Sequence, residues 1–543
     1  MAKIEFPRGI IEKEIKLNAK IIEKINMFGI PVESLSEEKI ELEISANRPD
    51  LLSIYGFLRA FKSFLGKETG LKKYKIDTKL KNEYVIKVNK NIKEVRPYTA
   101  CAVVKGLTLN NQNIEEIINL QEKLHATIGR QRKKCAIGIY PMDKIKFPIN
   151  YEARKPEDIN FIPLGSDKEL NALQILQKHP AGKEYAELLQ GYDNFPVFVD
   201  EKGKILSMPP IINSEETGRV TTSTKDVFIE CSGWHKETLG IVLNIIVTTL
   251  ADMGGKIYAI TIKDEQELIS PDLSPKKIKI QKENIEKLLG IELKDRDIEK
   301  LAAKMGHEYK NNYVLVPPWR ADILHEVDIA EDIAIAYGYE NFIPQLPNVD
   351  TIGEESKNKI INSRITELLI GLGFIETSSF HFVTEEEARK IKIDKPILIE
   401  NSKTEYKILR QSLLIPILRT LSNNTNAEYP QKLCEIGAVF MHDDEHESGI
   451  KENNQLVIAL TPENFTEAKQ TLDYLLRMLK INYKLEEATK KGFVEGRTAE
   501  IIINNQRIGY FGEAHPNMLA DWHLKMPLAI IELNLEEIYK ILQ

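Results

Sequence analysis

Five carboxylates crowd a stretch of the chain that contains no lysine or arginine. The stretch lies between Arg320 and Lys357, although Lys and Arg make up 74 of the 543 residues. Crowded carboxylates repel one another unless a cation is near, so we expect their charge to be compensated from outside the segment. Mg²⁺, a basic patch on a partner chain and water are the three candidates. The five carboxylates are Asp322, Glu326, Asp328, Glu331 and Asp332.

The spacing of the last three carboxylates is compatible with a metal site on a helix. Asp328, Glu331 and Asp332 stand at i, i+3 and i+4, which predicts that they share one face. Asp322 precedes the helix and is available to cap it. Three or four convergent carboxylates suit Mg²⁺, which prefers oxygen ligands. The alternative is that acidic residues in a first turn simply stabilise the helix dipole, and the sequence alone leaves both open.

The densest basic run of the chain is RQRKK at residues 130–134. It follows a helical pattern that should end near Gly129. A positive helix end in solvent suits the helix dipole, whereas a nucleic-acid phosphate would give the run a function. Composition alone favours the first interpretation.

Familiar catalytic motifs are absent from the sequence. It contains no P-loop, GxGxxG, HExxH or GxSxG pattern. His442 and His446 lie in the hydrophilic segment MHDDEHESG and are interpreted as solvated rather than as metal ligands. PPIINS, at residues 209–214, places an asparagine amide beside a rigid apolar wall, although an ordinary loop after a strand would look the same.

Composition limits the class of protein. Because the formal net charge is −7, any contact with nucleic acid must come from local patches. No apolar run approaches the ~18 residues of a spanning helix, and the N-terminus lacks the core of a signal peptide. Four widely separated cysteines without a CxxC pair indicate a reduced protein with neither structural zinc nor a disulfide framework. We therefore predict a cytoplasmic protein that does not contact a membrane.

The elements that must position these residues predict an α+β multidomain protein. KIELEIS alternates as a strand, LLSIYGFLRAFKSFLG is helical, and residues 11–25 carry a further helical pattern. At ~150 residues per domain, the length allows three or four domains. The predicted regions are an N-terminal α/β domain at 1–85, the longest unit at 86–268, a small winged or helix-turn-helix-like module with the acidic helix at 270–345, and an antiparallel sheet backed by helices at 350–543.

Several motifs, in order, resemble one known family. They are ANRPDLLSIYG, QEKLHATIGRQRKKCAIGIY, LSMPPIINS, VFIE, VPPWRADILHEVDIAEDIAIAYGY, LRQSLLIPILR, CEIGAVF and GYFGEAHPNML. Together they make nearly the whole chain similar to the β subunits of phenylalanyl-tRNA synthetases, of the shorter archaeal and eukaryotic type.

The resemblance implies a role in an α₂β₂ enzyme. An α subunit would hold the site that activates phenylalanine with ATP and transfers it to tRNA(Phe). Residues 350–543 would be a catalytically inactive class II synthetase-like domain, since the sequence lacks the arginines that phosphate chemistry needs in such a domain. Residues 86–268 would be an editing domain that hydrolyses Tyr-tRNA(Phe), because an apolar pocket rejects one added hydroxyl only about 100-fold.

For the editing pocket, the resemblance points to LSMPPIINS and VFIECS. Glu230 would accept a hydrogen bond from the tyrosine hydroxyl, Ser207 would contact the amino acid, and Asn213 would orient the attacking water. The family often has aspartate, followed two positions later by threonine, where this chain has Glu230 and Ser232. No general base stands out, so positioned water and the ribose hydroxyl of the substrate would carry the reaction.

The resemblance also assigns a role to both charged clusters. The acidic residues would bind Mg²⁺ at a site shared with the α subunit, and the basic run would contact the tRNA backbone. The implied metal ligands are Asp322, Asp328, Glu331 and Asp332, and the implied tRNA contacts are Arg130, Arg132, Lys133 and Lys134.

Two other functions stay open. A freestanding deacylase would act on mischarged tRNA without an α subunit, and a non-catalytic tRNA-binding or assembly scaffold would keep a decayed pocket. Residues 350–543 argue against the deacylase, because a synthetase-like domain makes best sense as a platform for α. The departures at Glu230 and Ser232 leave the scaffold possible.

Overall fold

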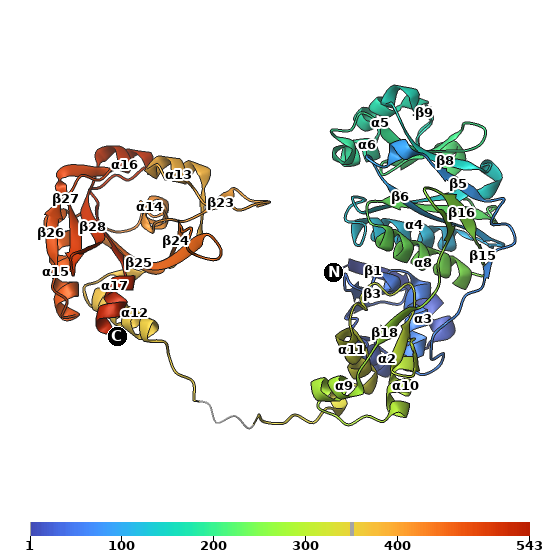
Figure 1. The fold of residues 1–543 in the computed structure, drawn as a ribbon, viewed down its shortest axis with the longest axis horizontal. Helices are drawn as coiled ribbons and strands as arrows, with labels where there is room; N and C mark the ends of the chain where they lie inside the picture. Colours follow the sequence, from blue (N-terminus) through green and yellow to red (C-terminus); the bar gives the residue numbers. More distant parts are fainter. Residues whose placement is uncertain (1, 348–351) are drawn as a thin grey trace. The chain divides into compact units, whose positions relative to one another are not determined.

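The computed structural model describes residues 2–347 and 352–543. The chain divides into two compact units, Met1–Leu346 and Pro347–Gln543 (Figure 1). None of the described helices is both long enough and apolar enough to cross a membrane.

An antiparallel three-stranded sheet, ordered β1-β3-β2, opens the first unit. The predicted strand KIELEIS is β3, and its apolar side chains alternate into the core. The helical pattern over residues 11–25 is split into two helices, because the Asn18 side chain caps the second by accepting a hydrogen bond from Ile21 N. The elements are β1 (Ala2–Pro7), α1 (Arg8–Glu14), α2 (Ala19–Met27), β2 (Val32–Leu35), β3 (Lys39–Ile44) and α3 (Ile54–Phe64).

The middle of the first unit is a pair of sheets packed face to face. A five-stranded sheet has the order β4-β15-β6-β14-β7, and a seven-stranded sheet has the order β13-β12-β11-β8-β5-β16-β17. Tyr140 and Phe228 from the first sheet and Tyr151 and Phe198 from the second fill the layer between them. The first of these strands begins at Ile76, ahead of residue 86, where the sequence placed the start of this region.

The strands of the five-stranded sheet are β4 (Ile76–Asp77), β6 (Tyr98–Lys105), β7 (Cys135–Pro141), β14 (Val227–Gly233) and β15 (Lys256–Tyr258). Those of the seven-stranded sheet are β5 (Val85–Val88), β8 (Ile149–Arg154), β11 (Phe195–Val199), β12 (Ile205–Met208), β13 (Ile212–Asn213), β16 (Ile260–Lys263) and β17 (Glu267–Ser270).

Helices α4 (Asn111–Ala126) and α8 (Lys236–Asp252) pack against the five-stranded sheet, α8 on β6 and β14 and α4 on β7. Their apolar side chains belong to the same buried cluster as those of the N-terminal sheet. Smaller elements between these strands are β9 (Asn160–Phe161), β10 (Leu170–Asn171), α5 (Ala172–Lys178), α6 (Pro180–Tyr185) and α7 (Glu215–Gly218).

A small module of three strands and three helices completes the first unit, with the sheet order β18-β20-β19. One buried cluster contains Phe57 of α3, Val247 of α8 and Trp319 of this module, so the three parts share a core. The elements are β18 (Lys276–Lys279), α9 (Lys282–Leu289), α10 (Asp295–Lys304), β19 (Glu308–Lys310), β20 (Tyr313–Val316) and the acidic helix α11 (Glu326–Tyr337).

The second unit is a seven-stranded sheet with helices on both faces. Its order is β21-β24-β25-β29-β28-β27-β26, in which only the β21–β24 pair is parallel. One buried cluster joins the sheet to α12, α15 and α17, and another joins it to α13, α14 and α16. The α+β prediction for this part of the chain is confirmed.

The strands of the second unit are β21 (Ile375–Glu376), β22 (Phe382–Thr384), β23 (Tyr406–Leu409), β24 (Gln431–His442), β25 (Ile450–Thr461), β26 (Lys484–Glu487), β27 (Phe493–Ile503), β28 (Gln506–Ala514) and β29 (Ala529–Asn534). The helices are α12 (Lys357–Gly371), α13 (Glu385–Ile391), α14 (Leu414–Asn423), α15 (Phe465–Met478), α16 (Pro516–Asp521) and α17 (Glu536–Leu542).

Candidate active site

A cavity of about 150 Å³ lies beside β7, the edge strand of the five-stranded sheet. The apolar segment Pro209–Ile212 forms one wall, and helix α4 contributes Gln121 and His125. Asn213 of β13 and Glu230 of β14 also line it. Both β13 and β14 belong to the paired sheets, so the cavity is built on rigid elements.

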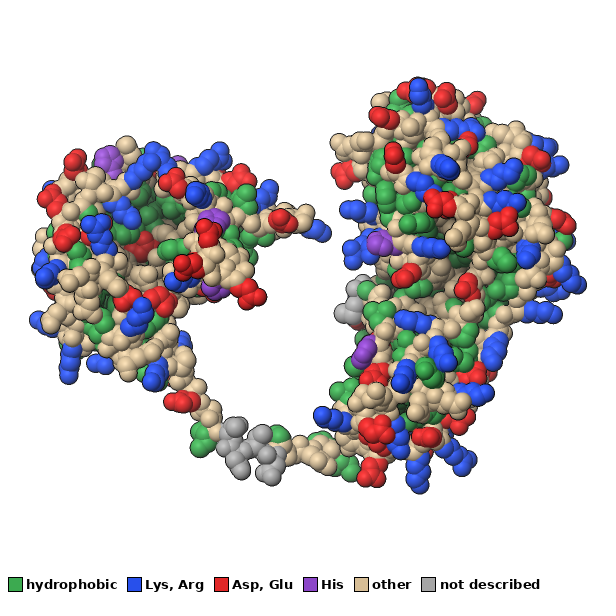
Figure 2. Space-filling view, in the orientation of Figure 1, with side chains coloured by type: hydrophobic (Ala, Val, Ile, Leu, Met, Phe, Trp, Pro, Cys, Tyr) green, Lys and Arg blue, Asp and Glu red, His purple; other side chains and the backbone are tan. Residues whose placement is uncertain are grey.

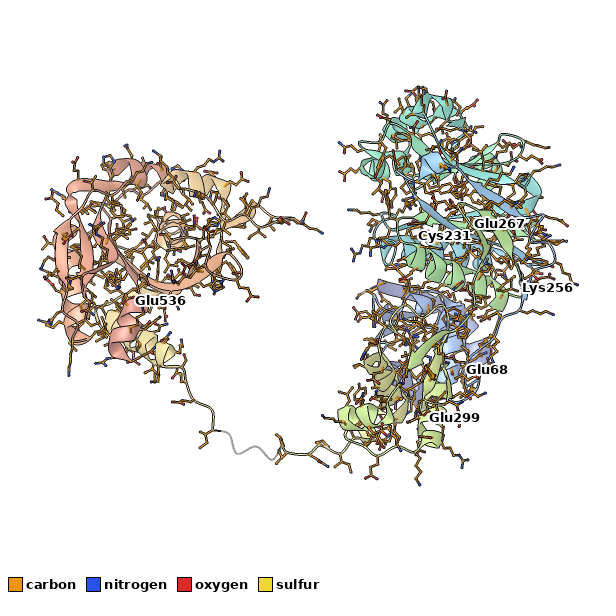
Figure 3. All side chains as sticks on the ribbon, in the orientation of Figure 1. Glu68, Cys231, Lys256, Glu267, Glu299 and Glu536 are labelled. Carbon is orange, nitrogen blue, oxygen red and sulfur yellow. The ribbon has the colours of Figure 1, made fainter. Side chains whose placement is uncertain are left out.

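Glu230 is buried in the layer between the two sheets. On β14, Val227, Ile229 and Cys231 pack into the cluster shared with α4 and α8, so the alternate residues face the other sheet. Figure 3 labels Cys231, the next residue along this strand. The Glu230 side chain is 1% exposed, and its Oε1 accepts a hydrogen bond of 3.1 Å from Tyr140 Oη. Its Oε2 is buried without a partner in the described part of the chain.

Burial raises the pKa of Glu230 to about 8, although the hydrogen bond from Tyr140 acts in the opposite direction. At pH 7 the side chain is therefore mostly a neutral carboxylic acid. It offers one carbonyl-type acceptor and one O–H donor rather than the carboxylate expected from the sequence. The unpartnered oxygen can then exchange a hydrogen bond with a hydroxyl in either direction.

The raised pKa of Glu230 predicts a pH-dependent stability difference between the wild type and Glu230→Gln. A group whose folded pKa lies near 8, against an ordinary 4.5, contributes stability that is complete below pH 4.5 and is lost as the pH rises through 8. Relative to Glu230→Gln, which does not titrate, the wild type should lose up to about 1.4 kcal/mol per pH unit across this window. Urea unfolding of both proteins at several pH values from 5 to 9 measures the difference, and a constant difference would rule out the raised pKa.

Tyr140 connects Glu230 to Asn213. Its hydroxyl lies 3.1 Å from Glu230 Oε1 and 3.3 Å from Asn213 Oδ1, and its ring stacks on Phe228. Gly138 lies opposite Glu230 on the neighbouring strand, and a Cβ there would stand 2.1 Å from Tyr140 Oη and 2.6 Å from Glu230 Oε1. Only glycine leaves room for this contact between the two side chains.

The remaining predicted pocket residues have different surroundings. Ser207 pairs with Asn213 across β12 and β13, and its Oγ is buried without a partner among the described residues. Ser232 does not line the cavity: its Oγ accepts a hydrogen bond of 3.1 Å from Nε of the buried Arg96. Asn213 and Glu230 thus line the cavity. Ser207 lies beside Asn213 in the sheet without lining the cavity, and Ser232 anchors Arg96.

The basic run forms a strained turn, and one of its arginines points inward. Arg130, Gln131 and Arg132 all have left-handed backbone conformations, with φ of 48°, 54° and 63°. Arg132 Nη1 donates to Ile211 O at 2.8 Å, and its Nη2 donates to Glu122 Oε1 at 3.2 Å. The interpretation of the whole run as a solvated helix end is therefore wrong for Arg132, which holds the apolar wall of the cavity.

The other basic side chains of the run are more accessible. Arg130 and Lys133 are exposed, and Lys134 is half-buried. On the face drawn in Figure 2, lysine and arginine side chains are interspersed with acidic ones over the first unit, rather than gathered in one patch.

His125 belongs to the same wall and was not singled out from the sequence. Its Nε2 accepts a hydrogen bond of 2.9 Å from Ile137 N, so Nδ1 carries the proton and donates to Glu122 at 3.3 Å. Burial lowers the pKa of His125, which keeps the ring neutral. Gln121 Nε2 donates to Ile137 O at 3.2 Å. Side chains of α4 thus bind backbone N–H and C=O groups on the outer edge of β7, where a further strand would otherwise pair.

The acidic cluster has its own cation inside the chain. Arg320 donates two hydrogen bonds of 2.7 Å to Asp322 and also binds Asp332, with a shortest contact of 2.9 Å. His307 Nε2 lies 2.6 Å from the same Asp332 carboxylate. The three candidates inferred from the sequence did not include Arg320, the arginine that borders the segment, which folds back onto Asp322 and Asp332.

The predicted metal ligands do not converge in this chain. Asp332 is 4% exposed whereas Glu331 is exposed, so the two do not share one face. Asp328 Oδ2 accepts from the backbone N–H groups of Leu324 and His325, which caps α11. Across residues 2–347 and 352–543, no group of three His, Cys, Asp or Glu side chains is placed to hold a metal. With Asp322 and Asp332 committed to Arg320, the four residues do not fit a metal centre held by this chain alone.

Comparison with known proteins gives the chain a family. Residues 80–241 match the B3/4 domain, residues 278–339 the tRNA synthetase B5 domain, and residues 343–535 the phenylalanyl tRNA synthetase beta chain CLM domain. The phenylalanine–tRNA ligase beta subunit of Methanocaldococcus jannaschii is 40% identical over 532 residues, with 95% of this chain and 96% of the relative covered. The chain belongs to the family of phenylalanine–tRNA ligase β subunits.

Other members of this β-subunit family agree. The beta subunit of Thermococcus kodakarensis is 38% identical over 520 residues, covering 91% of this chain and 90% of the relative. A crystal structure of an N-terminal fragment of the phenylalanyl-tRNA synthetase β subunit from Pyrococcus horikoshii has a TM-score of 0.59 and 38% identity, covering 62% of this chain and 99% of the fragment. The resemblance inferred from the motifs is therefore confirmed, and this β subunit is part of an ATP-dependent phenylalanine–tRNA ligase.

Proposed function

We propose that this β subunit hydrolyses Tyr-tRNA(Phe) in the cavity that Glu230 lines. The observation that supports this most is the buried, unpartnered Glu230 Oε2. A phenol hydroxyl would complete its hydrogen bonding, whereas the ring of phenylalanine would leave the oxygen unsatisfied at a cost of about 1–3 kcal/mol. A site of this kind selects the substrate that carries the hydroxyl.

The other site residues have distinct roles in this proposal. The buried Ser207 Oγ, also without a partner in the described chain, contacts the amino acid. Asn213 orients the attacking water, and the Tyr140 hydroxyl, which donates to Glu230 Oε1, lies 3.3 Å from Asn213 Oδ1. Ser232 positions Arg96 rather than touching the substrate. In this proposal no side chain acts as general base. The enzyme accelerates hydrolysis of the ester by positioning the water and the ribose hydroxyl of the substrate.

Replacing Asn213 with alanine should slow hydrolysis of Tyr-tRNA(Phe) by about 10- to 100-fold, because the attacking water loses its orienting group. The assay mixes holoenzyme with preformed Tyr-tRNA(Phe) and follows release of tyrosine. Asn160→Ala is the matched control, since Asn160 is exposed on β9 in the same unit. If the wild-type holoenzyme releases tyrosine no faster than the spontaneous reaction, the chain is a scaffold for α and tRNA instead.

The proposal extends to the assembly in which this β subunit works. We infer an α₂β₂ tetramer in the cytoplasm that attaches phenylalanine to tRNA(Phe), with residues 86–268 as the editing domain and residues 350–543 as an inactive platform for α. The proposed inactivity is supported by Arg410, which is 1% exposed and binds Glu435 at 2.8 Å. Its charge is neutralised within the chain and does not face a phosphate. Co-expression with an α chain should yield a complex of four chains.

Mg²⁺ and tRNA contacts follow from the family. We propose that Mg²⁺ accompanies ATP in the holoenzyme. Of the four implied ligands, the exposed Glu331 and the half-buried Asp328, which caps α11 through Oδ2, are available to a shared site. For the tRNA backbone, the exposed Arg130 and Lys133 are the proposed contacts, with Lys134 beside them. Arg132 is withdrawn from that role because its guanidinium is held by Ile211 and Glu122.

A further inference from the structure

Three arginines line a cavity of about 220 Å³ where helix α3 meets the small module of the first unit. Arg48 precedes α3 and Arg59 lies on it, while Trp319 and Arg320 follow β20 of the module. Glu68, labelled in Figure 3, also lines the cavity, with a side chain that is 56% exposed. We call this space the arginine cavity. It shares no lining residue with the Glu230 cavity.

Each of these arginines uses only part of its guanidinium. Arg48 binds Asp50 through Nε and Nη2, at 2.9 and 2.8 Å, and Arg320 binds its two carboxylates through the same pair of nitrogens. Within the described residues, Nη1 of both side chains makes no hydrogen bond. Arg59 donates only from Nη1, to Asp252 and to a tyrosine hydroxyl, and its Nη2 is buried without a partner in the described chain. The three side chains are only 11%, 8% and 3% exposed, in chain order.

The positive charges of the three arginines converge on one place. Burial alone would raise the pKa of Asp50, but Arg48, Arg320 and Arg59 hold it below its ordinary value. The carboxylates that pair with Arg59 and Arg320 do not line the cavity. Its charged lining consists of Arg48, Arg59, Lys72 and Arg320 against Asp50 and Glu68. An anion in the cavity would therefore face more positive than negative side chains.

We propose that the arginine cavity binds the phosphate group of a small phosphate ester. Planar carboxylates already occupy the two-nitrogen forks of Arg48 and Arg320. What remains is one N–H group on each of these side chains and the fork of Arg59. A carboxylate is bound best by a single fork, whereas a tetrahedral phosphate can accept hydrogen bonds from several directions.

An apolar wall beside the arginines favours an ester over free phosphate. The wall is formed by Leu71, Met305, Pro317 and Trp319. Arg59 Cζ lies 4.4 Å from the centre of the Trp319 ring, and a tyrosine ring packs edge-on against it, so the indole is held in place. A ring or alkyl group attached to the phosphate would cover this wall and displace water from it.

Calorimetric titration of the full-length chain with inorganic phosphate and with phenyl phosphate tests the proposal. Sodium chloride of equal ionic strength is the reference, because screening alone changes exposed ion pairs. Both phosphates should bind, and the phenyl ester should bind about tenfold more tightly, since only the ester covers the apolar wall. Equal binding of the two would keep the phosphate site but assign it to the free ion.

Two variants locate the binding. Arg48→Lys keeps a positive charge beside Asp50 but removes the free guanidinium N–H, and should weaken binding about tenfold. Arg48 is chosen because Arg59 also lines a neighbouring cavity of about 330 Å³, which Arg48 does not. Ala60→Leu narrows the arginine cavity with all three arginines intact and should weaken binding similarly. Arg296→Lys, at an exposed position of α10, is the matched control.

The inference is overturned if phosphate binds the wild type no better than chloride, which would mean that only water fills the cavity. It is also overturned if both cavity variants bind phosphate as Arg296→Lys does, since the phosphate would then bind elsewhere. If Arg48→Lys fails to fold, Ala60→Leu decides. The titration uses no tRNA, so its result is independent of the proposed hydrolysis at Glu230.

Discussion

Replacing Glu230 with leucine should lower kcat/KM for hydrolysis of Tyr-tRNA(Phe) by about 100-fold or more and leave the slow hydrolysis of Phe-tRNA(Phe) unchanged or slightly faster. Leucine fills similar space but cannot bind the phenol, so the substrate hydroxyl would be buried without a partner. The leucine also removes the unpartnered oxygen that disfavours phenylalanine. Single-turnover assays of the holoenzyme with both aminoacyl-tRNAs measure the change in selectivity.

Glu230→Gln separates polarity from charge at this position. Because burial raises the pKa of Glu230 to about 8, the side chain is mostly neutral at pH 7, and an isosteric neutral amide should retain much of the activity there. The two proteins should diverge above pH 8, where only the wild type ionises. Equal losses in the leucine and glutamine variants at pH 7 would show that an ionised carboxylate is required and that the neutral-acid account is wrong.

The second large effect concerns Arg320, whose replacement by methionine should destabilise the first unit by about 3–5 kcal/mol. Its side chain is 3% exposed and neutralises both Asp322 and Asp332. Burial alone would raise the pKa of Asp332, but Arg320 and His307 hold it well below its usual range. Without the arginine, a buried carboxylate is left paired only with a histidine. Urea unfolding monitored in the first unit gives the loss.

Two further variants test whether the loss of stability in Arg320→Met comes from the unpaired carboxylates. Arg296→Met, at an exposed position of α10 in the same module, should change stability by less than about 0.5 kcal/mol. Adding Asp332→Asn to Arg320→Met should recover part of the loss, because the unpaired charge is removed. A destabilisation of Arg320→Met below about 1 kcal/mol would contradict the internal neutralisation of the acidic cluster.

Local patterns predicted much of the fold. The alternation of KIELEIS specified β3, and the amphipathic spacing after Ser53 specified α3, whose first turn that serine caps. These signals lie within a few residues of each other in sequence. The split at Asn18 was missed because a side-chain cap interrupts an apolar pattern without altering its period.

The site was predicted less completely, because its contacts join distant segments. Glu230, Ser207 and Asn213 came from the family resemblance, whereas Tyr140 and Gly138 depend on the register between β7 and β14, which no local pattern encodes. The cation that neutralises the acidic cluster was missed for a similar reason. A count of basic residues within the segment could not show that Arg320, at its border, turns back onto two of its carboxylates.

The most direct test of this account is the ratio of single-turnover hydrolysis rates of Tyr-tRNA(Phe) and Phe-tRNA(Phe) by the wild-type holoenzyme at pH 7. Selection by a buried hydrogen-bonding group at Glu230 predicts that the tyrosyl ester is cleaved about 100-fold faster or more. Equal rates for the two esters, or no hydrolysis of either above the spontaneous rate, would contradict it.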